Sequence, residues 1–296
     1  MTGMTPVETI AQLDRASRKT VFSLRGADNV WRSWGRGPAM ILLHGNFGGW
    51  MHWARNIEAL ARVRRIFVPD LPGFGESGLP VVNTADEIAG MLELGLRSLA
   101  VREEIDIVGF SFGASVAGAL AKRLGGQARH LVVVSAGHLR LSKAPIAPFA
   151  AWRHLPTEEE RDAAHRRNLH AMMISRMERI DDLAIHIQRE NTSRRRLKTD
   201  DITKSHPLRP ILDELDCPVV GIWGERDSTI GPFMQERLDL FRALGSRFAA
   251  YTIPDAGHWL QYEAAARFNE LLLSVLACSP LEYSLSSDSA RVGTPH

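Results

Sequence analysis

Three residues of this chain have the side-chain types that nucleophilic catalysis by a serine requires. Ser111 stands at the centre of Gly109-Phe110-Ser111-Phe112-Gly113, and Asp227 and His258 follow it in that order. A serine hydroxyl is a weak nucleophile, so it needs a histidine base within hydrogen-bond reach and an acid that orients this base. We therefore predict Ser111 as the nucleophile and His258 as the base, with Asp227 or its nearest rival Glu225 as the acid.

The residues around Ser111 predict a sharp turn from a buried strand into a helix. Residues 105–108 are short, β-branched and apolar, which is typical of a buried strand, and residues 114–124 are rich in Ala and Leu, which favours a helix. The flanking glycines remove side chains that would collide at such a turn, and the first N–H groups of the helix can stabilise an oxyanion. The pentapeptide alone is a modest signal, but this context is the one that the motif requires.

The rest of the chain alternates between apolar runs and helical stretches. This rhythm predicts an α/β fold with a doubly wound, mostly parallel sheet of about eight strands. In such sheets the chemistry lies beyond the carboxyl ends of the strands, and His44, Ser111, Asp227 and His258 all come just after predicted strands. We expect strands at 20–24, 30–34, 39–43, 65–69, 105–108, 131–134, 218–223 and 248–253, and helices at 50–63, 84–100, 114–124, 233–244 and up to 277. The turn-forming residues 26–29 predict that the first two strands form a hairpin.

From residue 139 to about residue 210 the sequence contains no apolar run typical of a buried strand. Thr157 with Glu160 three residues later has the pattern of a capping box, and Asp181-Asp182 precedes another apolar stretch. We interpret this region as an inserted helical cap. The predicted division is a flexible leader at 1–18, an α/β core at 19–138 and 211–278, a helical cap at 139–210 and a disordered tail at 279–296.

Composition limits the possible partners and locations. A formal net charge of +2 is too small to indicate binding of nucleic acid or of an acidic membrane. The two cysteines, Cys217 and Cys278, lack metal-site spacing, so we expect reduced thiols in a cytoplasmic protein and no metal site. No apolar run approaches the ~18 residues needed to span a bilayer. The oligomeric state stays open.

Residues 73–78 match the dinucleotide fingerprint G-x-G-x-x-G and follow a predicted strand. The fingerprint works only when its glycines lead into a helix whose N-terminus binds the pyrophosphate. Leu79-Pro80-Val81-Val82 follows here instead. We therefore predict a loop at this position and no cofactor for the protein.

Four separated motifs together resemble the α/β-hydrolase superfamily over about residues 20–277. They are His44-Gly45-Asn46, Asp70-Leu71-Pro72-Gly73-Phe74-Gly75-Glu76-Ser77, Gly109-Phe110-Ser111-Phe112-Gly113 and Gly257-His258-Trp259. The resemblance implies a triad of Ser111, Asp227 and His258, because Asp227 lies where the family places its acid. It also implies an oxyanion hole made by the backbone N–H groups of Phe112 and Asn46, with His44 and Asp70 in structural roles.

The subclass is less sharply defined. Asn46 after His-Gly resembles the haloalkane dehalogenases, but those enzymes and the epoxide hydrolases use an aspartate nucleophile, whereas this chain has Ser111. Residues 257–263 look like the corresponding stretch of the meta-cleavage-product hydrolases, which cut carbon–carbon bonds. Two departures are Phe110, where those enzymes usually carry Asn, and a loop at 46–49 with less glycine. Those enzymes also use a cap arginine for the substrate carboxylate, and the candidates are Arg153, Arg176, Arg189 and Arg194-Arg195-Arg196.

Aromatic and methionine side chains near these motifs suit an apolar substrate pocket. We predict that it is lined by Phe47, Phe110, Trp259, Trp152, Met172 and Met173. The alternative for the cap residues is that they form the cap's own core, since Met often fills gaps.

The sequence as a whole predicts a cofactor-free serine hydrolase acting on an ester or a similar activated carbonyl of a hydrophobic small molecule. A carbon–carbon bond hydrolase is the first alternative. A ligand receptor that carries a triad, in which binding and cap movement matter more than turnover, is the second.

Overall fold

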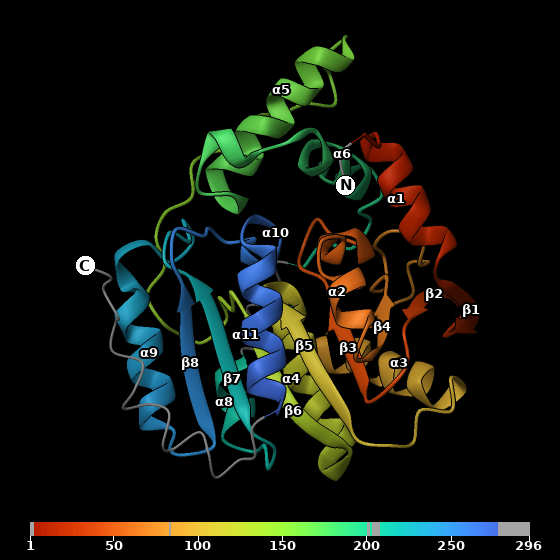
Figure 1. The fold of residues 1–296 in the computed structure, drawn as a ribbon, viewed down its shortest axis with the longest axis vertical. Coiled ribbons are helices and arrows are strands. Elements are labelled where there is room, and N and C mark those ends of the chain that lie inside the picture. Colours follow the sequence, from red (N-terminus) through yellow and green to blue (C-terminus); the bar gives the residue numbers. More distant parts are fainter. Residues whose placement is uncertain (1–2, 83, 200–201, 203–207, 278–296) are drawn as a thin grey trace.

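The structure is a computed structural model that describes residues 3–82, 84–199, 202 and 208–277 (Figure 1). In these residues eight strands form one sheet in the order β1-β2-β4-β3-β5-β6-β7-β8. Strands β3 to β8 pair in parallel, whereas β2 is antiparallel to both β1 and β4, so the predicted doubly wound sheet is confirmed. The strands are β1 Arg18–Leu24, β2 Ala27–Trp34, β3 Ala39–Leu43, β4 Arg65–Pro69, β5 Ile105–Phe110, β6 Ala128–Val134, β7 Val219–Gly224 and β8 Phe248–Ile253.

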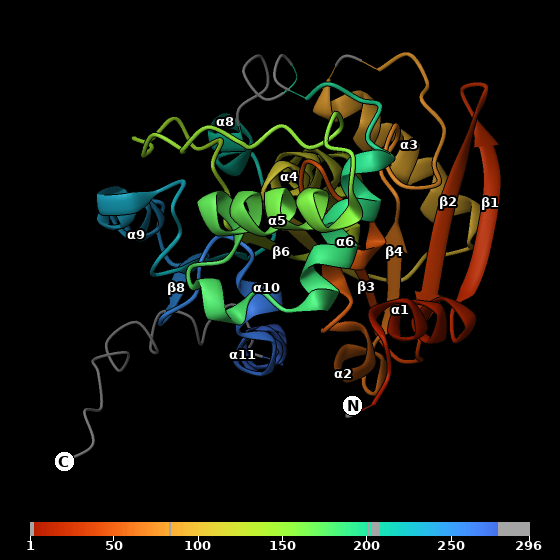
Figure 2. The same ribbon diagram turned by 90° about the horizontal axis from the view of Figure 1, so that it is seen from above.

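Helices cover both faces of the sheet, as the view from above shows (Figure 2). Helices α3, α4, α8 and α9 lie on one face, α2, α10 and α11 lie on the other, and α5 and α6 form the cap. Their bounds are α1 Pro6–Arg15, α2 Ile57–Ala61, α3 Ala85–Ser98, α4 Phe112–Leu124, α5 Glu158–Asn168, α6 Asp182–Ser193, α8 Leu208–Leu212, α9 Met234–Ala243, α10 Leu260–Glu263 and α11 Ala265–Ala277.

The alternation of side chains along each strand divides the core into two clusters. In β3, Ile41 and Leu43 pack with α3 and α4, while Met40 and Leu42 pack with α2 and α11 on the other face. All four side chains are fully buried. A continuous apolar run therefore indicates a strand covered on both sides.

The first two strands form the predicted hairpin, but its turn lies elsewhere than expected. We expected the turn at residues 26–29, whereas Ala27 already pairs with Leu24. The two turn residues are Arg25 and Gly26, with φ of 52° and 74°. Two successive residues with positive φ give the turn type whose twist matches that of a hairpin.

The prediction of a flexible leader at residues 1–18 is wrong for the part that the structure describes. Helix α1 begins at a complete capping box of Thr5 and Glu8. Leu13 is 3% exposed, and its carbonyl accepts the indole N–H of Trp34 at 2.9 Å. One buried leucine and one capping box are enough to order a short helix against β2 and the cap.

Other predicted helices differ in their detail. The helix expected at 50–63 is a 3₁₀ turn at Trp50–Trp53 followed by the short α2. Between them the Asn56 side chain donates to the Gln261 carbonyl and to the Asn269 side chain, so contacts distant in sequence shape this segment.

The cap begins its helices where the sequence predicts. Thr157 and Glu160 form a capping box at α5, and Asp181 caps α6. A π-helical turn at Leu169–Met173 follows α5. Helix α8 packs on α4, where Leu208 lies against Gly118, so the start of α8 belongs to the core rather than to the predicted cap. The predicted tail at 279–296 lies outside the described residues.

Candidate active site

Ser111 occupies the turn between β5 and α4 in a strained conformation. Its φ is 52° and its ψ is −112°, an unusual combination for a residue other than glycine. The neighbouring strand supports this turn, because the Ser111 N–H donates to the Val134 carbonyl at 2.8 Å. A Cβ atom at Gly113 would lie 2.5 Å from the His44 carbonyl oxygen, so only glycine fits there. The turn therefore holds a partly buried serine hydroxyl at the edge of the sheet.

The structure brings Ser111, His258 and Asp227 into one hydrogen-bonded chain. His258 Nε2 lies 3.0 Å from Ser111 Oγ, and His258 Nδ1 lies 2.8 Å from Asp227 Oδ2. Because an ionised carboxylate can only accept, Nδ1 donates its proton to Asp227, and Nε2 is left to accept from the serine. His258 and Asp227 are 3% and 1% exposed. This arrangement can take a proton from the serine hydroxyl and stabilise the imidazolium that results.

The acid is held by a threonine that the sequence analysis missed. Thr229 donates both its N–H, at 2.9 Å, and its hydroxyl, at 2.7 Å, to Asp227 Oδ1. Burial alone would raise the pKa of Asp227, but the charge of His258 and the hydrogen bonds from His258 and Thr229 outweigh it and lower this pKa. An Asp followed two residues later by Thr is a turn pattern that could have revealed this contact.

Ser135 supports the histidine and was also missed. It follows β6 at the same edge of the sheet with φ of 48°, and its hydroxyl donates to the His258 carbonyl at 2.8 Å. Its position directly after a buried strand was the available signal.

The loop after β3 lies against the nucleophile. A Cβ atom at Gly45 would lie 3.2 Å from Ser111 Cβ, so the backbone leading to Asn46 passes beside the serine. The Asn46 side chain accepts the Phe47 N–H at 2.9 Å, which fixes Phe47 at a φ of 54°. Phe112 is the first residue of α4, where a backbone N–H has no partner within the helix. Phe112 thus directly follows Ser111, and Asn46 directly follows the Gly45 backbone that lies beside Ser111.

His44 and Asp70 have the structural positions that the resemblance implies. His44 Nδ1 donates to the Gly45 carbonyl at 2.8 Å, and its Nε2 accepts the Leu71 N–H at 2.9 Å. Burial lowers the pKa of His44 to about 4, so this imidazole is neutral at pH 7. Asp70 accepts the N–H groups of Trp50 and Glu76, at 2.8 and 3.1 Å. These bonds shape the loop at 73–78, where no helix begins.

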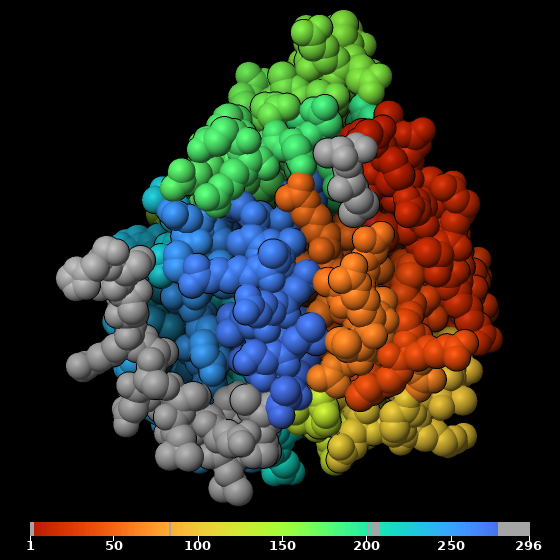
Figure 3. Space-filling model, viewed as in Figure 1, coloured from red at the N-terminus to blue at the C-terminus, as the bar shows by residue number. Residues whose placement is uncertain are grey.

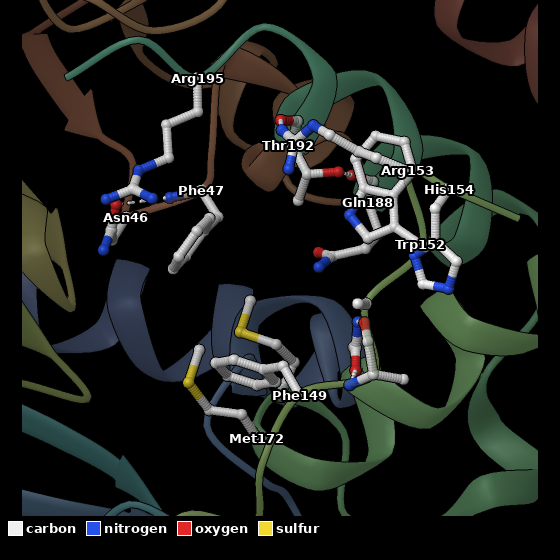
Figure 4. A pocket seen from close by; sticks show the side chains of 14 residues that line it. Asn46, Phe47, Phe149, Trp152, Arg153, His154, Met172, Gln188, Thr192 and Arg195 are labelled. Carbon is white, nitrogen blue, oxygen red and sulfur yellow. Dashed lines mark hydrogen bonds between the residues drawn. The ribbon is translucent and has the colours of Figure 1, made fainter. Parts of the chain in front are cut away.

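A cavity of about 390 Å³ lies between this loop and the cap (Figure 4). Asn46 and Arg195 lie at one end, Arg153, Trp152 and His154 lie at the other, and Phe47, Phe149 and Met172 lie between them. The lining residues are Asn46, Phe47, Phe149, Ala150, Ala151, Trp152, Arg153, His154, Asn168, Met172, Met173, Gln188, Thr192 and Arg195.

Four of the predicted pocket residues line this cavity, and two do not. Phe47, Trp152, Met172 and Met173 are in its wall. Phe110 and Trp259 are 1% and 0% exposed in the core cluster of α2 and α11. Phe110 packs against the rings of His52 and His258, and Trp259 stacks on Tyr262 at 4.1 Å. The prediction that these two aromatic residues line the pocket is therefore wrong.

Two of the candidate cap arginines reach the cavity. Arg195 lies over the Phe47 ring at 4.1 Å, and Arg153 lies over the Trp152 ring at 4.5 Å. Arg176 pairs instead with Asp255, and Arg189 pairs with acidic residues of α5.

The described part of the chain contains no group of three His, Cys, Asp or Glu side chains that could hold a metal ion. No helix in that part is both long enough and apolar enough to cross a bilayer.

The sheet, the strained serine and the hydrogen-bonded triad define the α/β hydrolases as the class. The chain matches the model of the alpha/beta hydrolase family over residues 40–271, and it belongs to this family. It is 26% identical over 293 residues to a 2-hydroxy-6-oxononadienedioate/2-hydroxy-6-oxononatrienedioate hydrolase of Paraburkholderia phymatum, an alignment that covers 91% of this chain and 99% of the relative.

Two solved structures show the same fold. A meta-cleavage product hydrolase from Pseudomonas fluorescens is 23% identical with a TM-score of 0.67, and the match covers 86% of this chain and 96% of that one. An esterase from Rhodococcus sp. is 19% identical with a TM-score of 0.67, and the match covers 88% of this chain and 98% of that one.

Proposed function

We propose that this protein is a serine hydrolase that cleaves an activated carbonyl compound through an acyl-enzyme on Ser111, without a cofactor. The observation that carries this proposal is the hydrogen-bonded chain from Ser111 through His258 to Asp227. Ser111 Oγ attacks the carbonyl carbon while its proton passes to His258 Nε2. The oxyanion forms beside the N–H groups of Phe112 and Asn46, and the leaving group departs with the proton held by His258. Water then releases the acid by the same steps.

The cavity favours a small and largely apolar substrate. A volume of about 390 Å³ and a wall that includes Phe47, Phe149, Met172 and Trp152 suit an acyl or aryl group. The cavity begins at Asn46, which follows the loop residue packed against Ser111. A carbonyl at Ser111 can therefore belong to a chain or ring that extends into the cap.

The first experiment measures kcat and KM of the wild type and of Ser111→Ala with a medium-chain p-nitrophenyl ester. We expect multiple turnovers in the wild type and a kcat lower by about 10⁶ in the variant, because the triad works as a unit. Unchanged turnover in Ser111→Ala would refute the mechanism. One slow turnover that leaves a lasting adduct on Ser111 would instead indicate a ligand receptor.

A second candidate is the hydrolysis of a carbon–carbon bond in a substrate of the meta-cleavage type. The name of the Paraburkholderia phymatum relative describes a dienedioate, which carries carboxylates. Arg153 and Arg195 place two guanidinium groups in the cavity wall, and guanidinium groups suit carboxylates. In this reaction the carbon leaving group would take its proton from His258 as the bond to the keto carbon breaks.

A pair of kcat/KM values separates the two candidates. One substrate is the p-nitrophenyl ester, and the other is a 2-hydroxy-6-oxo-dienoate with a 6-aryl group. If the dienoate is preferred, Arg195→Gln should raise its KM roughly 10- to 100-fold through loss of a charged hydrogen bond. Arg194→Gln is the matched control, because Arg194 pairs with Glu190 on α6 outside the cavity wall. An equal KM in both variants would exclude Arg195 as the carboxylate partner.

We also infer a cytoplasmic location from the presence of only two cysteines. Burial raises the pKa of the Cys217 thiol to about 11, which makes this thiol unreactive. Fractionation of cells that express the full chain tests this inference.

A further inference from the structure

One segment of the cap is hydrogen-bonded to both loops that carry the base and the acid of the triad. The Trp259 N–H donates to the Met173 carbonyl at 2.7 Å, and the Ser228 hydroxyl donates to the Met172 carbonyl at 3.1 Å. Trp259 follows His258 in the sequence, and Ser228 follows Asp227. Met172 and Met173 also line the cavity. The wall that would contact a substrate is thus bonded to the neighbours of two triad residues.

The π-helical turn at Leu169–Met173 makes these bonds possible. Its closing bond runs from the Ile174 N–H to the Leu169 carbonyl at 2.8 Å. This wider turn shifts the hydrogen-bond register by one residue, and turns of this kind are frequent at functional sites. The carbonyls of Met172 and Met173 bond to the catalytic loops instead of continuing a helix.

Glu263 closes the connection between the cap and the histidine loop. Its side chain is 0% exposed. Oε2 accepts the N–H of Gly257 at 2.7 Å and the N–H of Ser175 at 3.0 Å. Gly257 directly precedes His258, and Ser175 lies in the cap. One buried carboxylate oxygen therefore joins the cap to the loop that carries the base.

The second carboxylate oxygen of Glu263 also faces the cap. Oε1 accepts the Ser175 hydroxyl at 2.7 Å and lies 3.5 Å from Arg179 Nη1. The Ser175 hydroxyl also lies 3.1 Å from the Asp255 carbonyl, but its single proton favours the shorter bond to the carboxylate. Because the N–H groups of Gly257 and Ser175 would lose their acceptor if the carboxylate were lost, Glu263 is costly to replace.

The cap and the histidine loop are in direct contact, with no free space between them. A Cβ atom at Gly257 would lie 2.7 Å from the Ser175 nitrogen and 3.0 Å from the Met173 oxygen. In the space-filling view the green cap rests on the blue C-terminal region that contains this loop (Figure 3). The cap therefore contacts the backbone on both sides of His258, at Gly257 and at Trp259.

We propose that Glu263 is a positioning residue, which fixes the His258 loop to the cap and so keeps the imidazole directed at Ser111 while a substrate fills the cavity. This inference rests on the proposed serine-hydrolase function. Glu263 itself touches neither the triad side chains nor the cavity. It acts through the Gly257 N–H on one side and through Ser175 on the other.

The test compares Glu263→Gln with Glu178→Gln as the matched control. Glu178 is a cap residue whose side chain is 70% exposed and lies 3.8 Å from Arg176, so its replacement removes one charge but no buried bond. The concentration of reactive Ser111 in each protein is obtained from the burst of p-nitrophenol. Then kcat per reactive site is measured with p-nitrophenyl hexanoate, whose acyl chain we expect to extend into the cavity, and with p-nitrophenyl acetate, whose methyl group is too short to do so.

We expect Glu263→Gln to lower kcat per reactive site on the hexanoate by roughly 10- to 100-fold, because small misplacements of a catalytic group have effects of this size. The ratio of kcat for the hexanoate to kcat for the acetate should fall as well. In this variant the contact of the substrate chain with the cap wall no longer affects the position of His258. Loss of stability alone would lower the number of reactive sites and leave this ratio unchanged. Glu178→Gln should keep the wild-type values.

A wild-type kcat per site and a wild-type ratio in Glu263→Gln would overturn the inference. If this variant does not fold, Ser175→Ala decides, because it removes only the hydroxyl donor. We expect Ser175→Ala to lower the ratio roughly two- to tenfold, and an unchanged ratio would refute the coupling. Turnover that persists in Ser111→Ala contradicts the proposed function instead, so the two failures are distinguishable.

Discussion

Acid should destabilise this protein through His44, whose neutral imidazole is buried beside the loop that leads to Asn46. Its Nδ1 donates to the Gly45 carbonyl and its Nε2 accepts the Leu71 N–H, so a second proton would point at another donor. Burial lowers the pKa of His44 from 6.5 to about 4, and the Gly45 carbonyl opposes this only in part. Between these two values the unfolded chain binds a proton that the folded chain excludes, so stability falls as pH falls.

The size of the effect follows from the two pKa values. At pH 5 the imidazole is mostly charged in the unfolded chain and mostly neutral in the folded chain, which costs about 2 kcal/mol of unfolding free energy relative to pH 7.5. At pH 4 and below, the loss approaches about 3 kcal/mol. Glutamine at position 44 binds no proton. When the pH falls from 7.5 to 5, we therefore expect the free energy of unfolding of His44→Gln to decrease by about 2 kcal/mol less than that of the wild type. At pH 7.5 itself the variant is the less stable protein.

The assay is urea unfolding at several pH values, followed by tryptophan fluorescence and by circular dichroism. Equal slopes of the free energy against urea in all samples confirm that the same folded and unfolded states are compared. His44→Asn is a second replacement without a titrating group and should behave as His44→Gln does. If the free energy of unfolding of both variants falls as much as that of the wild type between pH 7.5 and 5, protonation of His44 does not cause the loss of stability in acid.

Three further predictions concern the triad, α1 and the cap. Asp227→Asn should lower kcat by about 10⁴ at unchanged fold, because the carboxylate selects the tautomer of His258; steady-state kinetics checks this. Leu13→Ala should lower the free energy of unfolding in urea by about 2–4 kcal/mol, because Leu13 packs α1 on the core. An unchanged free energy of unfolding would indicate that α1 does not pack on the core. Arg196→Gln should cost about 1 kcal/mol, since Arg196 donates to the carbonyls of Gly75 and Ser77. Arg194→Gln, which breaks an exposed pair, should cost less than about 0.5 kcal/mol in the same assay.

The positions of Ser111, Asp227 and His258 could be predicted because chemistry and chain direction both constrain them. A buried strand fixes where its carboxyl end lies, and parallel strands bring their carboxyl ends to one edge. Three polar residues that follow three such strands therefore lie along the same edge of the sheet. In the structure, His258 Nδ1 lies 2.8 Å from Asp227 Oδ2, and His258 Nε2 lies 3.0 Å from Ser111 Oγ.

Closeness in sequence to a catalytic motif did not reveal which way an aromatic side chain points. Phe110 precedes Ser111, yet it belongs to β5 and points to the same face as Val108, toward α2 and α11. The two-residue period of a strand already contained this information. Trp259 follows His258 in an irregular segment with no such period. Its indole N–H donates to the His52 carbonyl, a contact more than two hundred positions away that local sequence cannot reveal.

The run Arg194-Arg195-Arg196 shows why composition alone did not reveal which cap arginine reaches the cavity. A run of like charges is usually a solvated face, but these three side chains have three different environments. Helix α6 ends at Ser193, and the chain beyond it lies along the loop at 73–77, where the N–H groups of Arg196 and Leu197 both donate to the Gly73 carbonyl. This segment is neither a helix nor a strand, so its successive side chains follow no regular period. Arg194 turns back to Glu190, Arg196 reaches the core loop, and Arg195 between them reaches Phe47 and the cavity. The role of each arginine therefore depends on its place in the segment that follows α6, which composition does not reveal.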